Sequence, residues 1–130
     1  DYGMESYANG IAVSPAFLKK HPEAIRGFIR ATYKAARATV LHPKLAISAV
    51  KKFQPLVDNA VEADRLRLGV DCCILTPYVK KHGYGDVDMA RLQRSIEQAA
   101  LAYGLKNIPK AQDMFDRSYL PPKSERFIHK

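Results

Sequence analysis

The sequence predicts a mainly helical fold with one or two short β-strands. Apolar residues recur three or four positions apart along most of the 130-residue chain, as they do on one face of a helix. Prolines or capping residues stand where several of these patterns begin, and both favour the first turn of a helix. A strand-like alternation of apolar and small residues is seen only in residues 7–14.

The first two elements are expected to be a strand over residues 7–14 and a short helix after it. Ile11 and Val13 alternate with small residues, which suits a short strand. Ser14 can then cap a helix that begins at Pro15, because a proline in the first turn has no N–H to lose. This helix ends before Pro22.

Two longer helices are expected to begin at Pro22 and Pro43, each directly after a histidine. Helix starts explain both His-Pro pairs, so we interpret His21 and His42 as capping or loop residues rather than as a site. The apolar face of the first helix comprises Ile25, Phe28, Ile29, Thr32, Ala36 and Val40. The apolar face of the second, which ends at Pro55, comprises Ala46, Ala49, Val50 and Phe53.

The second half of the chain is expected to hold three more helices and a single helical turn. Asp58 can cap the first, whose apolar side comprises Ala63, Leu66, Val70 and Cys73. A short helix follows from Thr76-Pro77 through Lys81, and a loop rich in turn-forming residues covers 82–88.

The last long helix is expected to run from an Asp88 cap to Gly104. Gly104 stands where a left-handed residue closes a helix, and Leu105 can fold back as the hydrophobic contact of that cap. The buried face comprises Met89, Leu92, Ile96, Ala99, Ala100 and Tyr103. In the tail, residues 111–115 suit one helical turn, and Pro121-Pro122 end regular structure.

The motifs of catalytic and metal sites are absent from the sequence. The four histidines are far apart and lack partners at metal-ligand spacing; they are His21, His42, His82 and His129. No nucleophile elbow, phosphate-binding loop or dinucleotide motif occurs. Asp113 and Asp116 could share a helix face, but we interpret them as solvated surface residues. We therefore expect a protein that is not an enzyme and that uses no cofactor or metal.

The two cysteines, Cys72 and Cys73, are adjacent. Neighbouring cysteines rarely form a disulfide with each other, because the geometry is strained. They indicate neither a disulfide framework nor a zinc site. We expect at least one of them to be a buried core thiol.

The charge of the chain is strongly positive but evenly spread. Its formal net charge is +8, yet the lysines and arginines are interleaved with acidic residues and form no block of five or six. An anionic partner is compatible with this balance, but nucleic acid is not expected. No apolar run reaches the roughly 20 residues of a membrane span.

Tyr2, Tyr7 and Asn9 cluster before and at the start of the predicted strand. Such side chains can stack on and hydrogen-bond a flat or anionic ligand. The alternative is that a strand-end tyrosine packs on the core with its hydroxyl in water. Both interpretations are open at this point.

Four stretches, taken in order, resemble the NMT1/THI5-like solute-binding proteins of ABC transporters. They are "DYGMESYANGIAVS", "HPEAIRGFIRATYKAARATVLHPKLAI", "KKHGYGDVDMARLQRSIEQAALAYGL" and "IPKAQDMFDRSYLP". The similarity extends from about Asp1 to Pro121. The adjacent cysteines are not the cysteine-rich motif of the fungal thiamine-pyrimidine enzymes in this family, which argues against that branch.

The resemblance implies that residues 1–130 form the C-terminal portion of a two-lobed α/β periplasmic-binding-protein (type II) fold. Residues 1–14 would be a crossover and strand, 15–104 a helical region and 105–130 a C-terminal tail. The implied function is the capture of an anion, sulfonate or pyrimidine-like molecule in an interlobe cleft for delivery to a membrane permease. Tyr2, Tyr7 and Asn9 would lie near the cleft. The implied location is the periplasm, with a signal peptide upstream.

Two other hypotheses are open. A stand-alone basic helical module that binds a protein or nucleic acid would be a compact monomer with salt-sensitive affinity for polyanions. A solute-binding fragment would instead show an incomplete core and exposed apolar helix faces, which a second copy could cover. An enzyme of pyrimidine biosynthesis would need cofactor residues outside this chain.

Overall fold

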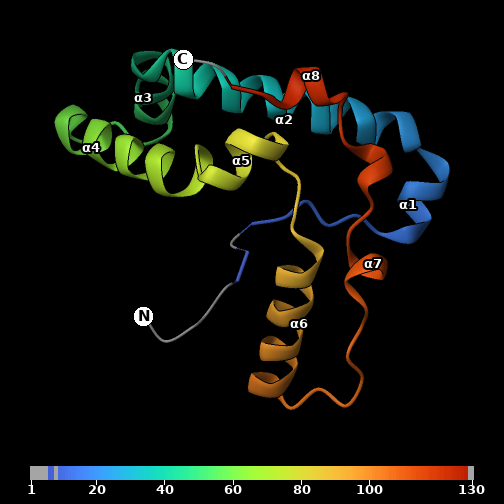
Figure 1. Cartoon of the computed structure of the whole chain (residues 1–130). Helices are drawn as coiled ribbons and strands as arrows, with labels where there is room; N and C mark the ends of the chain where they lie inside the picture. The colour runs from blue at the N-terminus through green and yellow to red at the C-terminus, as the bar shows by residue number, and fades with distance from the viewer. Residues whose placement is uncertain (1–5, 8, 129–130) are drawn as a thin grey trace.

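The structure is a computed structural model that describes residues 6–7 and 9–128. Helices dominate these residues, as the sequence predicts (Figure 1). In chain order they are α1 (Pro15–Lys20), α2 (Pro22–Leu41), α3 (Pro43–Phe53), α4 (Asn59–Gly69), the π-helical turn η1 (Val70–Ile74), α5 (Pro77–His82), α6 (Met89–Tyr103), α7 (Ala111–Met114), the 3-10 turn η2 (Arg117–Tyr119) and α8 (Lys123–Arg126).

The predicted strand is wrong for the residues that are described. Tyr7 and residues 9–14 form no strand, and no strand occurs elsewhere in the described ranges. A β-strand gains its backbone hydrogen bonds from a neighbouring strand. Without such a partner, the alternation of Ile11 and Val13 leads only to an irregular segment, which runs between α6 and α1 (Figure 1).

The helix boundaries follow the predicted capping residues. Ser14, Asp58 and Asp88 each accept a hydrogen bond from a backbone N–H in the first turn of the helix that follows. Thr76 caps α5 in the same way. At the end of α6, Gly104 adopts a left-handed conformation with φ +62°, and Leu105 N–H donates to the Ala100 carbonyl over 2.9 Å. These local signals were sufficient because each cap involves only a few consecutive residues.

Both His-Pro pairs are helix starts. Pro22 and Pro43 are the first residues of α2 and α3, and the histidines before them occupy the N-cap positions. Neither His21 nor His42 makes a side-chain capping hydrogen bond. The pairs therefore reflect the fixed φ of proline in a first turn.

The helices form two arms that meet at α2. In Figure 1, α3 stands beside one end of α2, α4 and α5 fold back beneath these two helices, and α6 projects away from them. The tail returns from the far end of α6 past α7 and η2, and α8 then lies along α2. The loop between α5 and α6 consequently stands where the two arms and the tail converge.

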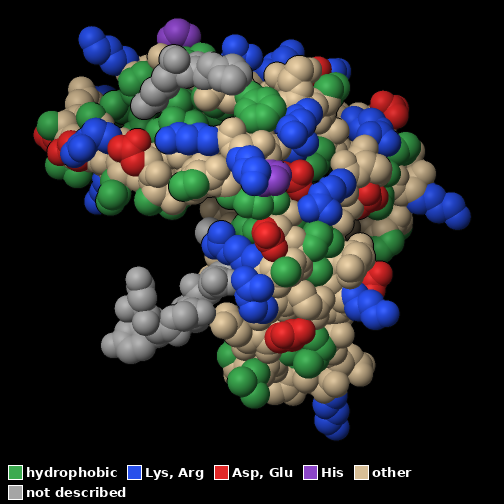
Figure 2. Space-filling model, viewed as in Figure 1, with side chains coloured by type: hydrophobic (Ala, Val, Ile, Leu, Met, Phe, Trp, Pro, Cys, Tyr) green, Lys and Arg blue, Asp and Glu red, His purple; other side chains and the backbone are tan. Residues whose placement is uncertain are grey.

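The core is small and its residues are spread over several elements of the described chain. Its buried apolar residues are Ile25, Tyr33, Val40, Val70, Val87, Ala100 and Ala111. The predicted buried face of α3 is wrong, since Phe53 is 87% exposed. The predicted buried face of α6 is confirmed at Ala100, which is 2% exposed, but wrong at Tyr103, which is 82% exposed. Hydrophobic side chains accordingly reach the surface over α4 and near the far end of α6 (Figure 2).

Candidate ligand-binding site

Tyr7 is anchored to the start of α6. Its hydroxyl oxygen accepts a hydrogen bond from Asp88 N–H over 2.9 Å. The guanidinium of Arg91 lies over its ring, 4.5 Å from the centroid, and Arg91 Nη2 also donates to the Ser6 carbonyl over 3.3 Å. The described contacts between the start of α6 and the segment before α1 thus include two hydrogen bonds and one cation–π contact.

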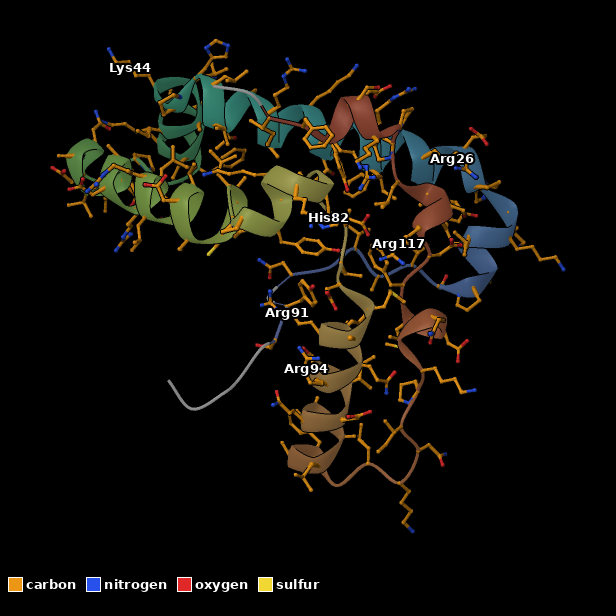
Figure 3. The ribbon with its side chains drawn as sticks, in the orientation of Figure 1. Arg26, Lys44, His82, Arg91, Arg94 and Arg117 are labelled. Atoms are coloured by element: carbon orange, nitrogen blue, oxygen red, sulfur yellow. The ribbon has the colours of Figure 1, made fainter. Side chains whose placement is uncertain are left out.

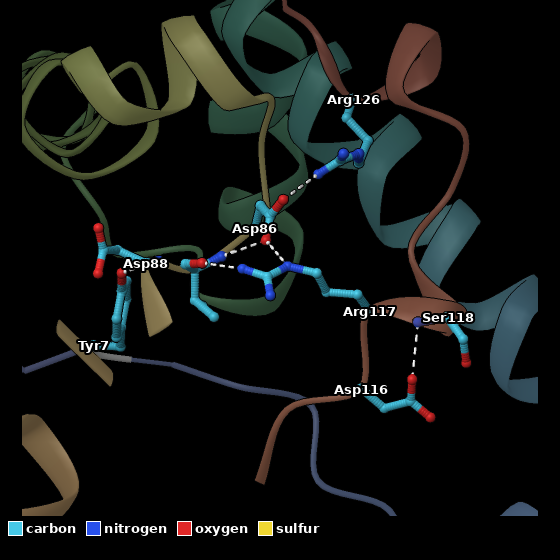
Figure 4. A network of polar contacts seen from close by, with 8 residues as sticks. Tyr7, Asp86, Asp88, Asp116, Arg117, Ser118 and Arg126 are labelled. Atoms are coloured by element: carbon cyan, nitrogen blue, oxygen red, sulfur yellow. Dashed lines mark hydrogen bonds and ion pairs between the residues drawn. The ribbon is translucent and has the colours of Figure 1, made fainter. Parts of the chain in front are cut away.

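Asp86 joins the loop between α5 and α6 to the tail (Figure 4). Arg117 Nε donates to Asp86 Oδ1 over 2.8 Å, and Arg126 Nη1 donates to Oδ2 over 3.3 Å. Val87 N–H donates to the same Oδ1, and Arg117 Nη2 donates to the Val87 carbonyl over 2.6 Å. One carboxylate therefore fixes two arginines and its own backbone.

The electrostatics of Asp86 favour its charged form. Burial acts to raise its pKa, but the hydrogen bonds from Arg117 and Val87 N–H and the charge of Arg117 outweigh burial, so the pKa lies below its ordinary value. The same pair raises the pKa of Arg117, mainly through its hydrogen bond to Asp86. The ion pair is thus intact at neutral pH.

Tyr33 and Arg126 close the inner side of this network. Arg126 is only 8% exposed, and its Nε has no hydrogen-bond partner among the described residues. Its carbonyl accepts from Tyr84 N–H over 2.8 Å, and the Tyr84 ring meets Tyr33 edge-on at 5.3 Å. Burial is the main cause that raises the pKa of Tyr33 to about 12. Gly85 has φ +79°, and a Cβ there would overlap the Tyr33 hydroxyl.

Tyr78 extends the polar cluster toward Tyr7. Burial raises the pKa of Tyr78, and the nearby Asp86, Tyr7 and Asp88 raise it further. On its other side, the Tyr78 ring stacks on His82 at a centroid distance of 4.4 Å. The cluster therefore brings two tyrosines and several charged groups together at the base of α6.

The structure places only part of the predicted binding set. Tyr7 is half-buried in the cluster, whereas Asn9 is exposed, and among the described residues no polar contact joins its side chain to Tyr7. Tyr2 lies outside the described residues. The ring of Tyr7 and the adjacent arginines are groups that could bind a flat or anionic molecule, but in this structure they bind one another.

Asp86, Arg117, Arg126 and Tyr33 were missed as site residues by sequence reasoning. Asp86 was interpreted as a loop residue, yet it is the centre of the network. Its partners lie 31 and 40 residues away, so no local pattern points to them. The signal that could have found it is the pair of glycines around it: Gly83 and Gly85 both have positive φ, which indicates a tightly constrained loop.

Two hollows of the surface lie away from Tyr7 and Asn9. One, of about 490 Å³, is lined by Asp71, Leu75, Lys80 and Ile128. The other, of about 300 Å³, runs between α2 and the tail and is lined by Glu23, Arg26, Gly27, Arg30, Tyr119, Leu120, Pro121 and Pro122. Arg30 in the second hollow is already held by two hydrogen bonds to Glu125.

Several basic side chains of the described residues come from different elements. Those labelled in Figure 3 come from α2, α3, α5, α6 and η2: Arg26, Lys44, His82, Arg91, Arg94 and Arg117. Within the described residues, no group of three or more histidines, cysteines or acidic residues is placed to hold a metal ion. None of the described helices combines the length and apolar character that crossing a bilayer requires.

Comparison with known proteins connects the first third of the chain with one family. Residues 1–46, which include Tyr7, Asn9, α1 and α2, match the family described as NMT1/THI5 like. No curated protein and no solved structure matches the chain. The similarity thus covers the segment anchored to α6 and the helix that carries Tyr33.

Proposed function

We propose that this chain is the C-terminal portion of the substrate-binding component of an ABC importer. It would act in the periplasm, without catalysis, and deliver a small anion, sulfonate or pyrimidine-like molecule to a permease in the membrane. The observation that carries the proposal is the similarity of residues 1–46 to the NMT1/THI5-like family. Solute binding is the role that this family suggests.

The exposed apolar faces support the proposal. Phe53 and Leu56 at the α3–α4 turn are 87% and 101% exposed, and Leu101 on α6 is 85% exposed. Large apolar side chains gathered at a surface mark places where another protein surface packs. A lobe of the same receptor or a second copy of the chain would supply that surface. A compact stand-alone module would have buried them.

The ligand is expected to meet Tyr7 and Asn9. Both residues lie in the segment that matches the family, and Tyr7 presents an aromatic ring beside the positive charge of Arg91. A ring and a cation together suit a flat or anionic solute. Binding would require Arg91 to exchange part of its contact with Tyr7 for the solute.

A thermal-shift experiment tests the proposal. The chain and the longer receptor that the proposal requires are heated with nitrate, alkanesulfonates, taurine or thiamine-pyrimidine precursors. A ligand that binds the native state raises Tm in proportion to the logarithm of its concentration once the site is saturated. We expect one class of solute to do so in the receptor.

Variants of Tyr7 locate the site. Tyr7→Ala is expected to abolish the solute-dependent shift, whereas Tyr103→Ala, which removes an exposed tyrosine of α6, should leave it unchanged. An undiminished shift in Tyr7→Ala would remove Tyr7 from the site. If no solute shifts Tm and the chain instead binds polyanions with steep salt dependence, the basic-module hypothesis replaces this one.

A further inference from the structure

Two thiols face each other at the surface where α4 ends. Cys72 and Cys73 are both free and both exposed, which contradicts the expectation that at least one is buried. Their sulfurs lie 3.0 Å apart. Cysteine is among the most frequently buried residue types, so packing does not explain two exposed cysteines side by side.

The π-helical turn explains why the sulfurs meet. Both cysteines lie in η1, where Leu75 N–H donates to the Val70 carbonyl, five residues earlier, over 2.7 Å. Consecutive side chains of an α-helix do not face each other. The wider π-turn reduces the angle between them, so both sulfurs come to one side. Such turns within helices occur frequently at functional sites.

A disulfide bond between Cys72 and Cys73 would be strained. The Cα atoms of consecutive residues are about 3.8 Å apart across a trans peptide. Disulfide-linked Cα atoms are usually about 4.4–6.8 Å apart. Closing the ring would therefore distort the helical turn, and the pair is expected to persist as two thiols.

The sulfur spacing discriminates between thiophilic ligands. With metal–sulfur bonds of about 2.3 Å, a linear two-coordinate ion would need sulfurs about 4.6 Å apart, whereas a pyramidal centre with bonds of that length at nearly right angles would need about 3.2 Å. The observed 3.0 Å fits the pyramidal case. Tetrahedral zinc does not fit, because the described residues offer no third protein ligand.

We propose that Cys72 and Cys73 form a dithiol site for a pyramidal trivalent thiophilic centre of the arsenic(III) type. An organic arsenic(III) oxide, R–As=O, forms two As–S bonds there, one with each sulfur. The two thiol protons leave with the oxide oxygen as one water molecule. Arsenic remains trivalent and no oxidant is consumed. This site is independent of the proposed transport role.

The neighbouring thiol also affects the reactivity of Cys72. The hydrogen bond with Cys73 is the main cause that raises the pKa of Cys72. A thiol with a raised pKa reacts slowly with simple alkylating reagents, because the thiolate is the nucleophile. The condensation with an arsenic oxide carries both thiol protons away in one water molecule, so the proton balance of the step is complete.

Phenylarsine oxide is the probe that tests the proposal. Intact-protein mass spectrometry is expected to show one phenylarsenic group per chain, removable by 1,2-ethanedithiol. Cys72→Ser and Cys73→Ser should each weaken binding at least about tenfold, because one As–S bond and its chelate ring are lost. Asp71→Ser, an exposed change in the same turn that keeps both thiols, should retain full affinity. Circular dichroism checks that the variants are folded.

A measurement on the chain unfolded in urea shows whether binding needs the folded geometry of η1 or only two cysteines that are adjacent in sequence. We expect the folded chain to bind at least about tenfold more tightly, because η1 already holds the sulfurs at the required spacing. Equal affinity in the folded and unfolded chains would overturn the proposal. Two arsenic groups per chain, or full affinity in either serine variant, would overturn it as well.

Discussion

Two regions of the molecule differ in the range of their contacts. The 83–88 loop is held by distant parts of the chain, whereas α3 and α4 are held by segments next to them in sequence. The loop is tied to the tail by ion pairs that span 31 and 40 residues, and one partner, Arg126, is buried. Helices α3 and α4 contact their neighbours in sequence, and the ion pairs of α4 join residues three apart at its surface. Neither α3 nor α4 contains a buried residue.

The difference shows which part of the chain fixes its own structure. Around the loop, charged and aromatic groups from three segments contact one another, and among the described residues only Arg126 Nε is a buried side-chain polar atom without a hydrogen-bond partner. Over α3 and α4, large apolar side chains are left in water, which is unfavourable by about 25 cal/mol for each Å². Substitutions around the loop are therefore expected to destabilise the fold, whereas substitutions of exposed residues in α3 and α4 are expected to have little effect on stability.

The largest loss of stability is expected from Gly85→Ala. Residue 85 has φ +79°, and its new Cβ would overlap the Tyr33 hydroxyl, so backbone strain and overpacking add to about 3–4 kcal/mol. Urea unfolding measures this loss. Gly27→Ala is the control: nothing lies within 4 Å of its Cβ, and in α2 it should stabilise by about 0.5–1 kcal/mol. Similar effects for both variants would contradict this account of the loop.

Asp86→Asn is expected to cost about 2–3 kcal/mol, because it leaves the buried Arg126 without a charged partner. Asp64→Asn, at an exposed ion pair of α4, should change stability by less than about 0.5 kcal/mol. The pKa of Asp86 is lowered in the fold, so its contribution is complete above about pH 4 and is lost as pH falls through the folded-state pKa. Urea unfolding at pH 7 and pH 3 should show the gap between wild type and Asp86→Asn narrowing in acid.

Tyr33 is expected to make the protein sensitive to alkaline pH. With its pKa raised to about 12, the folded state keeps a proton that the unfolded state releases above pH 10. Stability should fall by about 2 kcal/mol between pH 10 and 12. Tyr33→Phe should remove this part of the decline, whereas Tyr103→Phe, at an exposed position, should not. Parallel pH profiles for all three proteins would rule out Tyr33 as the cause.

The smallest effect on stability is expected at the α3–α4 turn. Phe53→Ser with Leu56→Ser should change the free energy of unfolding by less than about 0.5 kcal/mol, because both side chains are exposed. The same double variant should reduce self-association in sedimentation equilibrium if a second copy covers this surface. A large destabilisation of the monomer would show that these side chains are packed in solution.

Local features of the fold were predictable from the sequence, and long-range ones were not. The caps at Ser14, Asp58 and Asp88 were found because each is decided by residues within one turn. The burial of an apolar face depends on which segment packs against it. Helix α3 contacts α2 and α4, but in the described structure neither buries Phe53, so the helix was predicted correctly and its buried face was not.

Of Tyr7 and Asn9, the predicted ligand-binding residues that the structure describes, only Tyr7 lies in the polar cluster. The contacts of Tyr7 come from the start of α6, more than 80 residues away in the sequence, so no local pattern distinguishes Tyr7 from Asn9. Asp86 could not be matched to its partners, since 13 acidic residues face 21 lysines and arginines. Asp86 meets Arg117 and Arg126 only because the tail returns to the loop. The exposed dithiol likewise depended on a π-turn that the helical pattern did not reveal.

The return of the tail to α2 also determines when the fold can be completed. Arg30 with Glu125 and Arg26 with the Ser118 carbonyl connect residues 95 and 92 positions apart, so the chain closes on itself only near its end. During synthesis from the N-terminus, α3 and α4 can pair long before Arg117 and Arg126 exist. Asp86 can form its ion pairs only after both arginines have been synthesised. Closing so long a loop is slow relative to helix pairing, so docking of the tail is expected to be the last and rate-limiting event of folding.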